Sequence, residues 1–191
     1  MRLNHLTTLM LGALLSIGAA GAQRVPTPDK PPTLNPSAPW ISYKSPDGAF
    51  TFDTPRAPTV SPDSVTSSFG VLPMTKYVTE DGGVSMIILD SDGSNLQAEL
   101  NVESAIKATQ SDGRVFKSES VVQLDGHEGR YVIFSDGDGD QFALLIFIVG
   151  RHIYQALSLI PKDATPAQAA EAVRFVQSFH FPNQAPPDHP Y

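Results

Sequence analysis

Hydrophobic residues are densest in residues 141–161, which read QFALLIFIVGRHIYQALSLIP. The pair Gly150-Arg151 interrupts this run near its middle, where the chain can reverse direction. The pattern predicts two apolar strands that fold back on each other at this pair. We expect the resulting hairpin to form the centre of a sheet, around which the rest of the folded chain packs.

Shorter stretches with a period of two predict further strands. Residues 40–55 predict two short strands on either side of Ser45-Pro46-Asp47-Gly48, where Pro presets φ and Gly supplies a positive φ. More strands are expected at residues 64–72, 74–80, 84–90, 115–124 and 129–135. The turns between them are expected at residues 81–83, 125–128 and 136–140.

The spacing of apolar residues changes to about 3.6 between residues 95 and 110, as is typical of an amphipathic helix. Ser94 is the expected N-cap of this helix, and Gly113 is its expected stop. The change of period therefore predicts one helix in the middle of the chain.

A second helix is predicted at residues 166–178. Thr165 is a favourable N-cap, Pro166 occupies the first position, and Gln168 completes a capping box. The order of elements is thus many strands and two helices, without the strand–helix–strand alternation of a parallel sheet. It predicts an α+β fold, in which helices pack on a twisted antiparallel sheet of about six to eight strands.

The N-terminus has the features of a secretory signal peptide in residues 1–22. A short polar region precedes an apolar region at residues 6–17, and an Ala-x-Ala cleavage site ends at Ala22. The apolar region is shorter than the roughly 20 residues that span a bilayer, so we expect cleavage rather than anchoring. No cysteine follows it, which argues against lipoprotein processing. We expect a periplasmic or secreted protein without a transmembrane segment.

Proline-rich segments flank the folded part. Residues 23–39 contain six prolines and predict an extended tether. This tether could be a spacer or a ligand for a proline-binding domain, but an ordinary leader is the simpler interpretation. One domain is expected at residues 40–182, followed by a loose tail at residues 183–191.

The composition narrows the classes of function. The chain has 191 residues, a formal net charge of −7 and no cysteine. The length suits one domain, which we expect to be monomeric. The acidic balance argues against binding to nucleic acid or anionic lipid, both of which require a basic patch. Without cysteine the chain has no disulfide, no thiolate nucleophile and no cysteine-based zinc site.

Four motifs are spread over the folded part: YKSPDGAFTFDTP at residues 43–55, DGHEGRYVIF at 125–134, VGRHIYQALSLIP at 149–161 and RFVQSFHF at 174–181. Together they resemble the PsbP/Mog-type (PsbP-like) domain of small exported bacterial proteins. The resemblance covers about residues 40–182 and implies α/β/α packing around a twisted antiparallel sheet. Relatives of this type are accessory or partner-binding proteins, so the resemblance supplies no catalytic residues.

One acidic segment has the composition of a metal site. Asp136, Asp138 and Asp140 alternate with glycines, and a calcium ion would relieve the repulsion among their carboxylates. An EF-hand is excluded, because its sixth and twelfth positions would be Gln141 and Phe147. The alternative is a solvent-facing turn that is rich in Asp and Gly for backbone reasons. Calcium is the one cofactor that the sequence suggests.

A second set of polar residues flanks the predicted turns. His127, Glu128 and Arg130 follow one turn, and Arg151 and His152 follow the bend of the central hairpin. His127 and Glu128 could act as an acid/base pair, although an exposed turn explains them equally. If these turns lie at the same end of the sheet, they form a surface worth testing.

Two functional hypotheses remain open. The first is a non-catalytic envelope or extracellular accessory protein that binds another envelope protein or a cell-surface component. The second is an exported small-ligand carrier, or an enzyme whose site is assembled from distant residues. The sequence lacks G-x-S-x-G, G-x-G-x-x-G and P-loop motifs, which favours the first hypothesis and predicts no enzyme. A concave site with convergent polar groups would favour the second.

The predicted signal peptide can be checked directly. N-terminal sequencing of the exported protein is expected to begin at Gln23, because cleavage should follow Ala22. A substitution of Ala22 by a bulky residue is expected to block or shift the cleavage. An exported protein that still begins at residue 1 would contradict the prediction.

Overall fold

The computed structural model describes residues 39–67, 70–96, 99–109 and 114–182. The predicted signal peptide, the tether up to residue 38, the helix stop at Gly113 and the tail at residues 183–191 lie outside these residues. Within the described residues, no helix has the length and apolar character that crossing a membrane requires.

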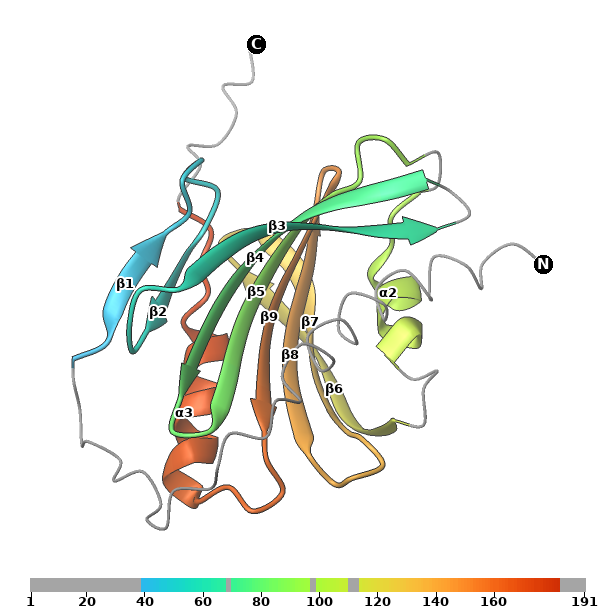
Figure 1. Ribbon diagram of the computed structural model, residues 1–191. Helices are drawn as coiled ribbons and strands as arrows, with labels where there is room; N and C mark the ends of the chain where they lie inside the picture. Colours follow the sequence, from blue (N-terminus) through green and yellow to red (C-terminus); the bar gives the residue numbers. More distant parts are fainter. Residues whose placement is uncertain (1–38, 68–69, 97–98, 110–113, 183–191) are drawn as a thin grey trace.

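A seven-stranded antiparallel sheet forms the middle of the fold, with the strand order β3-β4-β5-β9-β8-β7-β6 (Figure 1). Its strands are β3 (Thr59–Ser67), β4 (Gly70–Asp81), β5 (Val84–Asp92), β6 (Val115–Leu124), β7 (His127–Ser135), β8 (Gln141–Val149) and β9 (His152–Ile160). Two short strands, β1 (Ile41–Lys44) and β2 (Thr51–Thr54), pair separately. The predicted α+β class and antiparallel sheet are therefore confirmed.

The hairpin of β8 and β9 lies at the centre of the sheet, as the sequence predicts. It turns at Gly150, and β9 is the fourth strand of the seven. Leu144 and Leu157 belong to one buried cluster of apolar side chains, while Leu145 and Ala156 belong to another. Since successive side chains of a strand point to opposite faces, the hairpin is buried on both sides.

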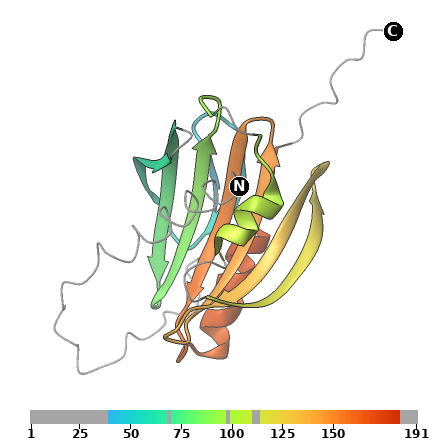
Figure 2. The same cartoon turned by 90° about the vertical axis from the view of Figure 1, so that its right-hand side faces the viewer.

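Each side of the sheet has its own cover (Figure 2). The helix α3 (Pro166–Gln177) and the β1–β2 pair cover one side, which we call the α3 face. The shorter helix α2 (Val102–Thr109) covers the other side, which we call the α2 face. The buried cluster of the α3 face includes Phe50, Phe52, Ile88, Phe147, Phe175 and Phe179, and that of the α2 face includes Leu72, Leu89, Leu96, Ile106, Val132 and Ile146. The α/β/α arrangement is thereby confirmed.

The helix α3 begins as its capping sequence predicts. The backbone N–H of Gln168 donates to the Thr165 side chain at 3.3 Å, and the Gln168 side chain accepts from the Thr165 N–H at 2.6 Å. At the other end, Ser178 Oγ accepts a hydrogen bond from the backbone N–H of Asp53 in β2, at 2.9 Å. Local capping thus places the start of α3, and a contact with β2 holds its end.

The middle helix starts later than its apolar pattern predicts, at Val102 instead of near Asn95, so Ser94 is not its N-cap. The guanidinium of Arg151 donates from Nε to the carbonyl of Gly93 at 3.1 Å, and its Nη2 donates to the carbonyl of Leu96. The Gly93 N–H in turn donates to the Arg151 carbonyl at 2.8 Å. These bonds hold this part of the chain in a non-helical connection, although Leu96 is still buried as the pattern predicts.

The boundary between β3 and β4 also differs from the prediction of two strands separated at Pro73. Pro73 lies inside β4 and is paired in register with Ser64 of β3. The pairing of β4 with β5 begins one residue later, at Met74. Pro73 therefore pairs with only one neighbouring strand, so its missing N–H interrupts at most one ladder of hydrogen bonds. A strand tolerates proline under this condition.

The hydrogen bonds of Arg151 predict a large effect on stability. We expect Arg151→Met to lower the free energy of unfolding by about 2–3 kcal/mol, because buried carbonyls lose bonds to a charged donor. Chemical denaturation measures this change. As a control, Arg56→Met removes the pair with Asp81, in which the Arg56 side chain is 61% exposed, and should cost less than about 1 kcal/mol. Equal effects of the two substitutions would contradict a special role for Arg151.

Candidate functional site

The sheet separates the predicted site residues into two groups at opposite ends. The turn between β6 and β7 and the turn between β8 and β9 lie at the same end, because Gly129 pairs with Phe147 and Val149 pairs with His152. The turn at residues 136–140 joins the other ends of β7 and β8. The structure therefore brings the predicted polar surface residues to one end of the sheet and leaves the aspartates at the other.

The aspartate turn uses its carboxylates to bind its own backbone. Asp136 Oδ1 accepts the N–H groups of Asp138 and Asp140, both at 3.0 Å, and Asp140 Oδ1 accepts the N–H of Lys162 at 3.0 Å. Among the described residues, no three His, Cys, Asp or Glu side chains are gathered so that they could hold a metal ion. The observed geometry is that of an Asp- and Gly-rich turn, and the calcium site stays a sequence prediction.

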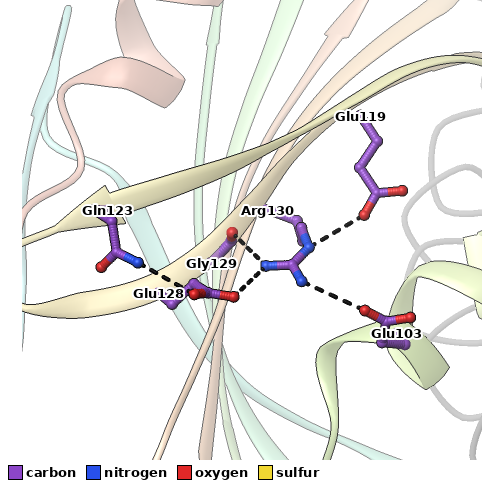
Figure 3. Close-up of polar contacts among 6 residues, drawn as sticks. All are labelled: Glu103, Glu119, Gln123, Glu128, Gly129 and Arg130. Atoms are coloured by element: carbon purple, nitrogen blue, oxygen red, sulfur yellow. Dashed lines mark hydrogen bonds and ion pairs between the residues drawn. The ribbon is translucent and has the colours of Figure 1, made fainter.

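Arg130 lies at the centre of an ionic cluster on the α2 face (Figure 3). Its guanidinium contacts the carboxylates of Glu128 at 2.8 Å, Glu119 at 3.3 Å and Glu103 at 3.4 Å. The hydrogen bond with Glu128 raises the pKa of Arg130 above its ordinary value. Three carboxylates surround one guanidinium, so the cluster carries an excess of negative charge. We call these four residues the Arg130 cluster.

His152 forms a second polar contact, on the α3 face. Its Nδ1 lies 3.0 Å from Asp90 Oδ1, and its ring stacks on Tyr154 with an interplanar angle of 12°. The Asp90 side chain is only 13% exposed, and this burial raises the pKa of its carboxyl above the ordinary value. Burial, together with the charge of Asp90, also raises the pKa of Tyr77 to about 12.

The remaining two predicted residues serve the fold. Arg151 is occupied by the carbonyls of Gly93 and Leu96, and the His127 ring packs edge-on against Phe181 with 4.9 Å between ring centroids. His127 therefore faces the C-terminal end of the domain, whereas Glu128 belongs to the Arg130 cluster. Adjacent residues of one strand point to opposite faces, so the sequence neighbours His127 and Glu128 do not form an acid/base pair.

A hollow of about 220 Å³ lies between α3 and the outer strands, on the α3 face. Its apolar wall is formed by Val122, Leu124, Leu145, Phe147, Val176 and Phe179. Tyr131 adds a phenol whose pKa is raised by burial, so this hydroxyl stays protonated. The hollow is thus lined mainly by uncharged groups.

Gly129 explains how Phe147 reaches this wall. A Cβ atom on Gly129 would lie 2.4 Å from the Phe147 ring, so only glycine leaves room for the ring to cross β7. The sequence shows the glycine but not the hollow, because the wall comes from β6, β7, β8, α3 and Phe179, which lies two residues beyond the end of α3. Sequence reasoning therefore missed this feature.

The edge strand β6 is the second feature that sequence reasoning missed. In the described part of the chain β6 pairs with β7 alone, and most of its residues are exposed. Three of its apolar side chains reach solvent: Val115, Phe116 and Val121, the last 59% exposed. The alternation along residues 115–124 predicts a strand, but whether a strand is central or at an edge depends on its partners.

Gln155 is a buried polar residue away from the hollow. Its amide nitrogen and oxygen have no hydrogen-bond partner among the described residues. In β9 its side chain points to the same face as those of Ile153 and Leu157, two residues before and two residues after it. Both of these residues belong to the buried cluster of the α2 face. The buried amide and the hollow are therefore on opposite sides of the sheet.

Comparisons with known proteins identify similar structures. No family model matches the chain, and no curated protein matches it. Among solved structures, it is similar to cyanobacterial PsbP (CyanoP) from Synechocystis sp. PCC 6803, with 12% identity and a TM-score of 0.48 over 76% of this chain and 94% of that one. It is also similar to a protein of unknown function from Pseudomonas aeruginosa, with 10% identity and a TM-score of 0.37 over 69% of this chain and 87% of that one. The first of these structures bears the name of the family that the sequence motifs resemble.

The buried carboxyl of Asp90 predicts a pH-dependent stability. Its pKa in the folded state is raised above the ordinary 3.8, so the stability that it contributes is present below that value and is lost as the pH rises through the folded-state pKa. Asp90→Asn keeps an oxygen for His152 without a buried charge. We therefore expect this variant to be more stable than the wild type at about pH 7, and equally stable below about pH 3.

Denaturation with urea over this pH range measures the effect. Asp92→Asn is a matched control with the opposite sign, because a hydrogen bond from Ser94 lowers the pKa of Asp92. This control should be less stable than the wild type at neutral pH, and the difference should vanish in acid. If Asp90→Asn is destabilising at neutral pH, the bond to His152 outweighs the burial of charge.

Proposed function

We propose that this protein is an exported, non-catalytic accessory protein that binds another protein of the envelope or cell surface. In this proposal an extended segment of the partner adds as a further strand along β6. Export rests on the signal peptide predicted for residues 1–22. The binding mode rests on one observation: β6 is long and exposed to solvent, and one of its edges has no partner strand among the described residues.

The register of the β6–β7 hairpin shows which backbone groups are free to bind. The two strands are joined by the two-residue turn Asp125-Gly126, with φ values of 51° and 85°, and Leu124 pairs with His127. In such a hairpin the pair next to the turn is hydrogen-bonded, and the pairs then alternate. The N–H and C=O groups of Val121 and its neighbours at alternate positions therefore point to the free edge, where a further strand can pair with them.

The opposite edge of the sheet is less suited to this role. The edge strand β3 contains Pro62, which has no N–H and is a common means of protecting a sheet edge. The sequence of β6, VFKSESVVQL, has no proline, and its only irregularity is the bulge between Phe116 and Ser118. The asymmetry between the two edges favours β6 as the docking strand.

The arrangement of the polar groups supports a binding protein over an enzyme. Arg130 and His152 are already paired with carboxylates, and Gln155 lies on the face opposite the hollow. A catalytic site requires polar groups that converge on one cavity. The apolar hollow beside α3 has about 220 Å³, which is smaller than the ~300 Å³ of typical small-molecule sites. A larger depression of about 610 Å³ runs along α3 itself, past Ala169, Val173 and Arg174.

A proline placed in β6 tests the proposal. Val121→Pro removes an N–H that faces the free edge while leaving the ladder with β7 in place, so it should block an added strand. Val60→Pro is the matched control, because Val60 is an exposed valine of the other edge strand, β3. It lies two residues from Pro62, so the backbone nitrogens of both residues point to the same edge of β3. The wild type, Val121→Pro and Val60→Pro are each used to capture proteins from the envelope fraction of the source organism.

We expect a protein that the wild type and Val60→Pro retain equally and that Val121→Pro loses by about tenfold or more. Melting temperatures of the two variants confirm that each is folded. Equal retention by all three proteins would contradict docking at β6. Loss with Val60→Pro but not with Val121→Pro would assign the binding to β3 instead.

A further inference from the structure

The two faces of β6 present different chemistry to a strand added at its free edge. Toward the α3 face, Val122 and Leu124 border the apolar hollow. Toward the α2 face, Glu119 contacts Arg130, and Gln123 donates to Glu128 at 3.3 Å (Figure 3). The α3 side of the edge is therefore apolar at Val122 and Leu124, whereas the α2 side is acidic around Arg130 and carries one exposed apolar residue, Val121, between Glu119 and Gln123.

Successive side chains of an added strand would meet these two surfaces in turn, since they point alternately to the two faces of the sheet. In strand addition the backbone bonds supply affinity, while the surfaces facing alternate side chains supply specificity. We infer that β6 selects an extended segment of a second protein in which apolar residues alternate with Lys or Arg. This inference rests on the proposed docking at β6 and states its specificity.

The size of the hollow suits a side chain from such a segment. Its volume of about 220 Å³ falls below that of sites for separate small molecules. It is bordered by Val122 and Leu124 of the edge strand itself, so an apolar side chain on the neighbouring added strand reaches it without leaving the sheet. Removal of such a side chain from water would strengthen the binding of the added strand.

On the α2 face, the charge of the Arg130 cluster determines which side chains of the added strand are favoured. The guanidinium is recessed, with 15% of the Arg130 side chain exposed, whereas the side chains of Glu119, Glu128 and Glu103 are 35%, 57% and 70% exposed. The carboxylates thus face solvent and outnumber the cation. A Lys or Arg on the added strand would be attracted, an Asp or Glu would be repelled, and the net charge of −7 would favour approach of a basic segment.

Synthetic peptides matched in length to β6 test this specificity on the purified protein. The first peptide alternates Val and Lys, the second replaces Lys by Glu, and the third replaces Val by Ala. Backbone amide NMR shifts of β6 residues report where each peptide binds, and titration gives its Kd. We expect the Val–Lys peptide to bind about tenfold more tightly than either of the others, and its affinity to fall as salt is added.

Two variants identify the residues responsible. Glu119→Gln combined with Glu128→Gln should reduce the preference for Lys over Glu to less than about twofold, while the preference for Val over Ala persists. Val122→Phe narrows the hollow from β6, so it should weaken the preference for Val over Ala and leave the charge preference intact. Unchanged preferences in both variants would overturn the inference.

The failures of the two proposals are distinguishable. If peptides bind at β6 and Val121→Pro abolishes binding, but Lys and Glu peptides bind equally, the specificity is wrong and docking at β6 stands. The same conclusion follows if no peptide binds while an envelope protein is captured in a manner sensitive to Val121→Pro. A dimer in sedimentation that Val121→Pro dissociates would make a second copy of this chain the occupant and overturn the inference.

Discussion

The fold depends on burial of the β8–β9 hairpin on both of its faces. Because Leu144 and Leu157 point one way and Leu145 and Ala156 the other, the sheet requires a cover on each side. The covers are unequal, since α3 and the β1–β2 pair cover one face and the shorter α2 covers the other. This requirement explains why two helices and an extra strand pair surround one sheet, and why the outermost strands are left to solvent.

The ionisable groups near the central hairpin are mostly used to hold these layers together. Arg151 fixes the connection that follows β5, His152 binds the carboxylate of Asp90, and Asp136 closes the turn between β7 and β8. Each of these groups would suggest chemistry in isolation. In the fold each has a structural partner: the carbonyl of Gly93 for Arg151, Asp90 for His152, and the backbone of its own turn for Asp136.

The features without an evident structural purpose lie at the β6 edge. A protected edge, such as β3 with Pro62, discourages pairing with other chains, and β6 lacks that protection. The hollow beside α3 and the Arg130 cluster flank this edge on opposite faces. The proposed recognition of another chain rests on this combination of free backbone groups with apolar and charged neighbours.

The sequence by itself determined what depends on neighbouring residues. The two apolar strands of residues 141–161, the capping box of Thr165 and Gln168, and the α+β class all follow from local pattern. Only the tertiary structure decided the start of α2, because Arg151 binds Gly93 from 58 positions away. It also decided that β6 is an edge and that a hollow lies beside it, since both depend on which strands and helices become neighbours.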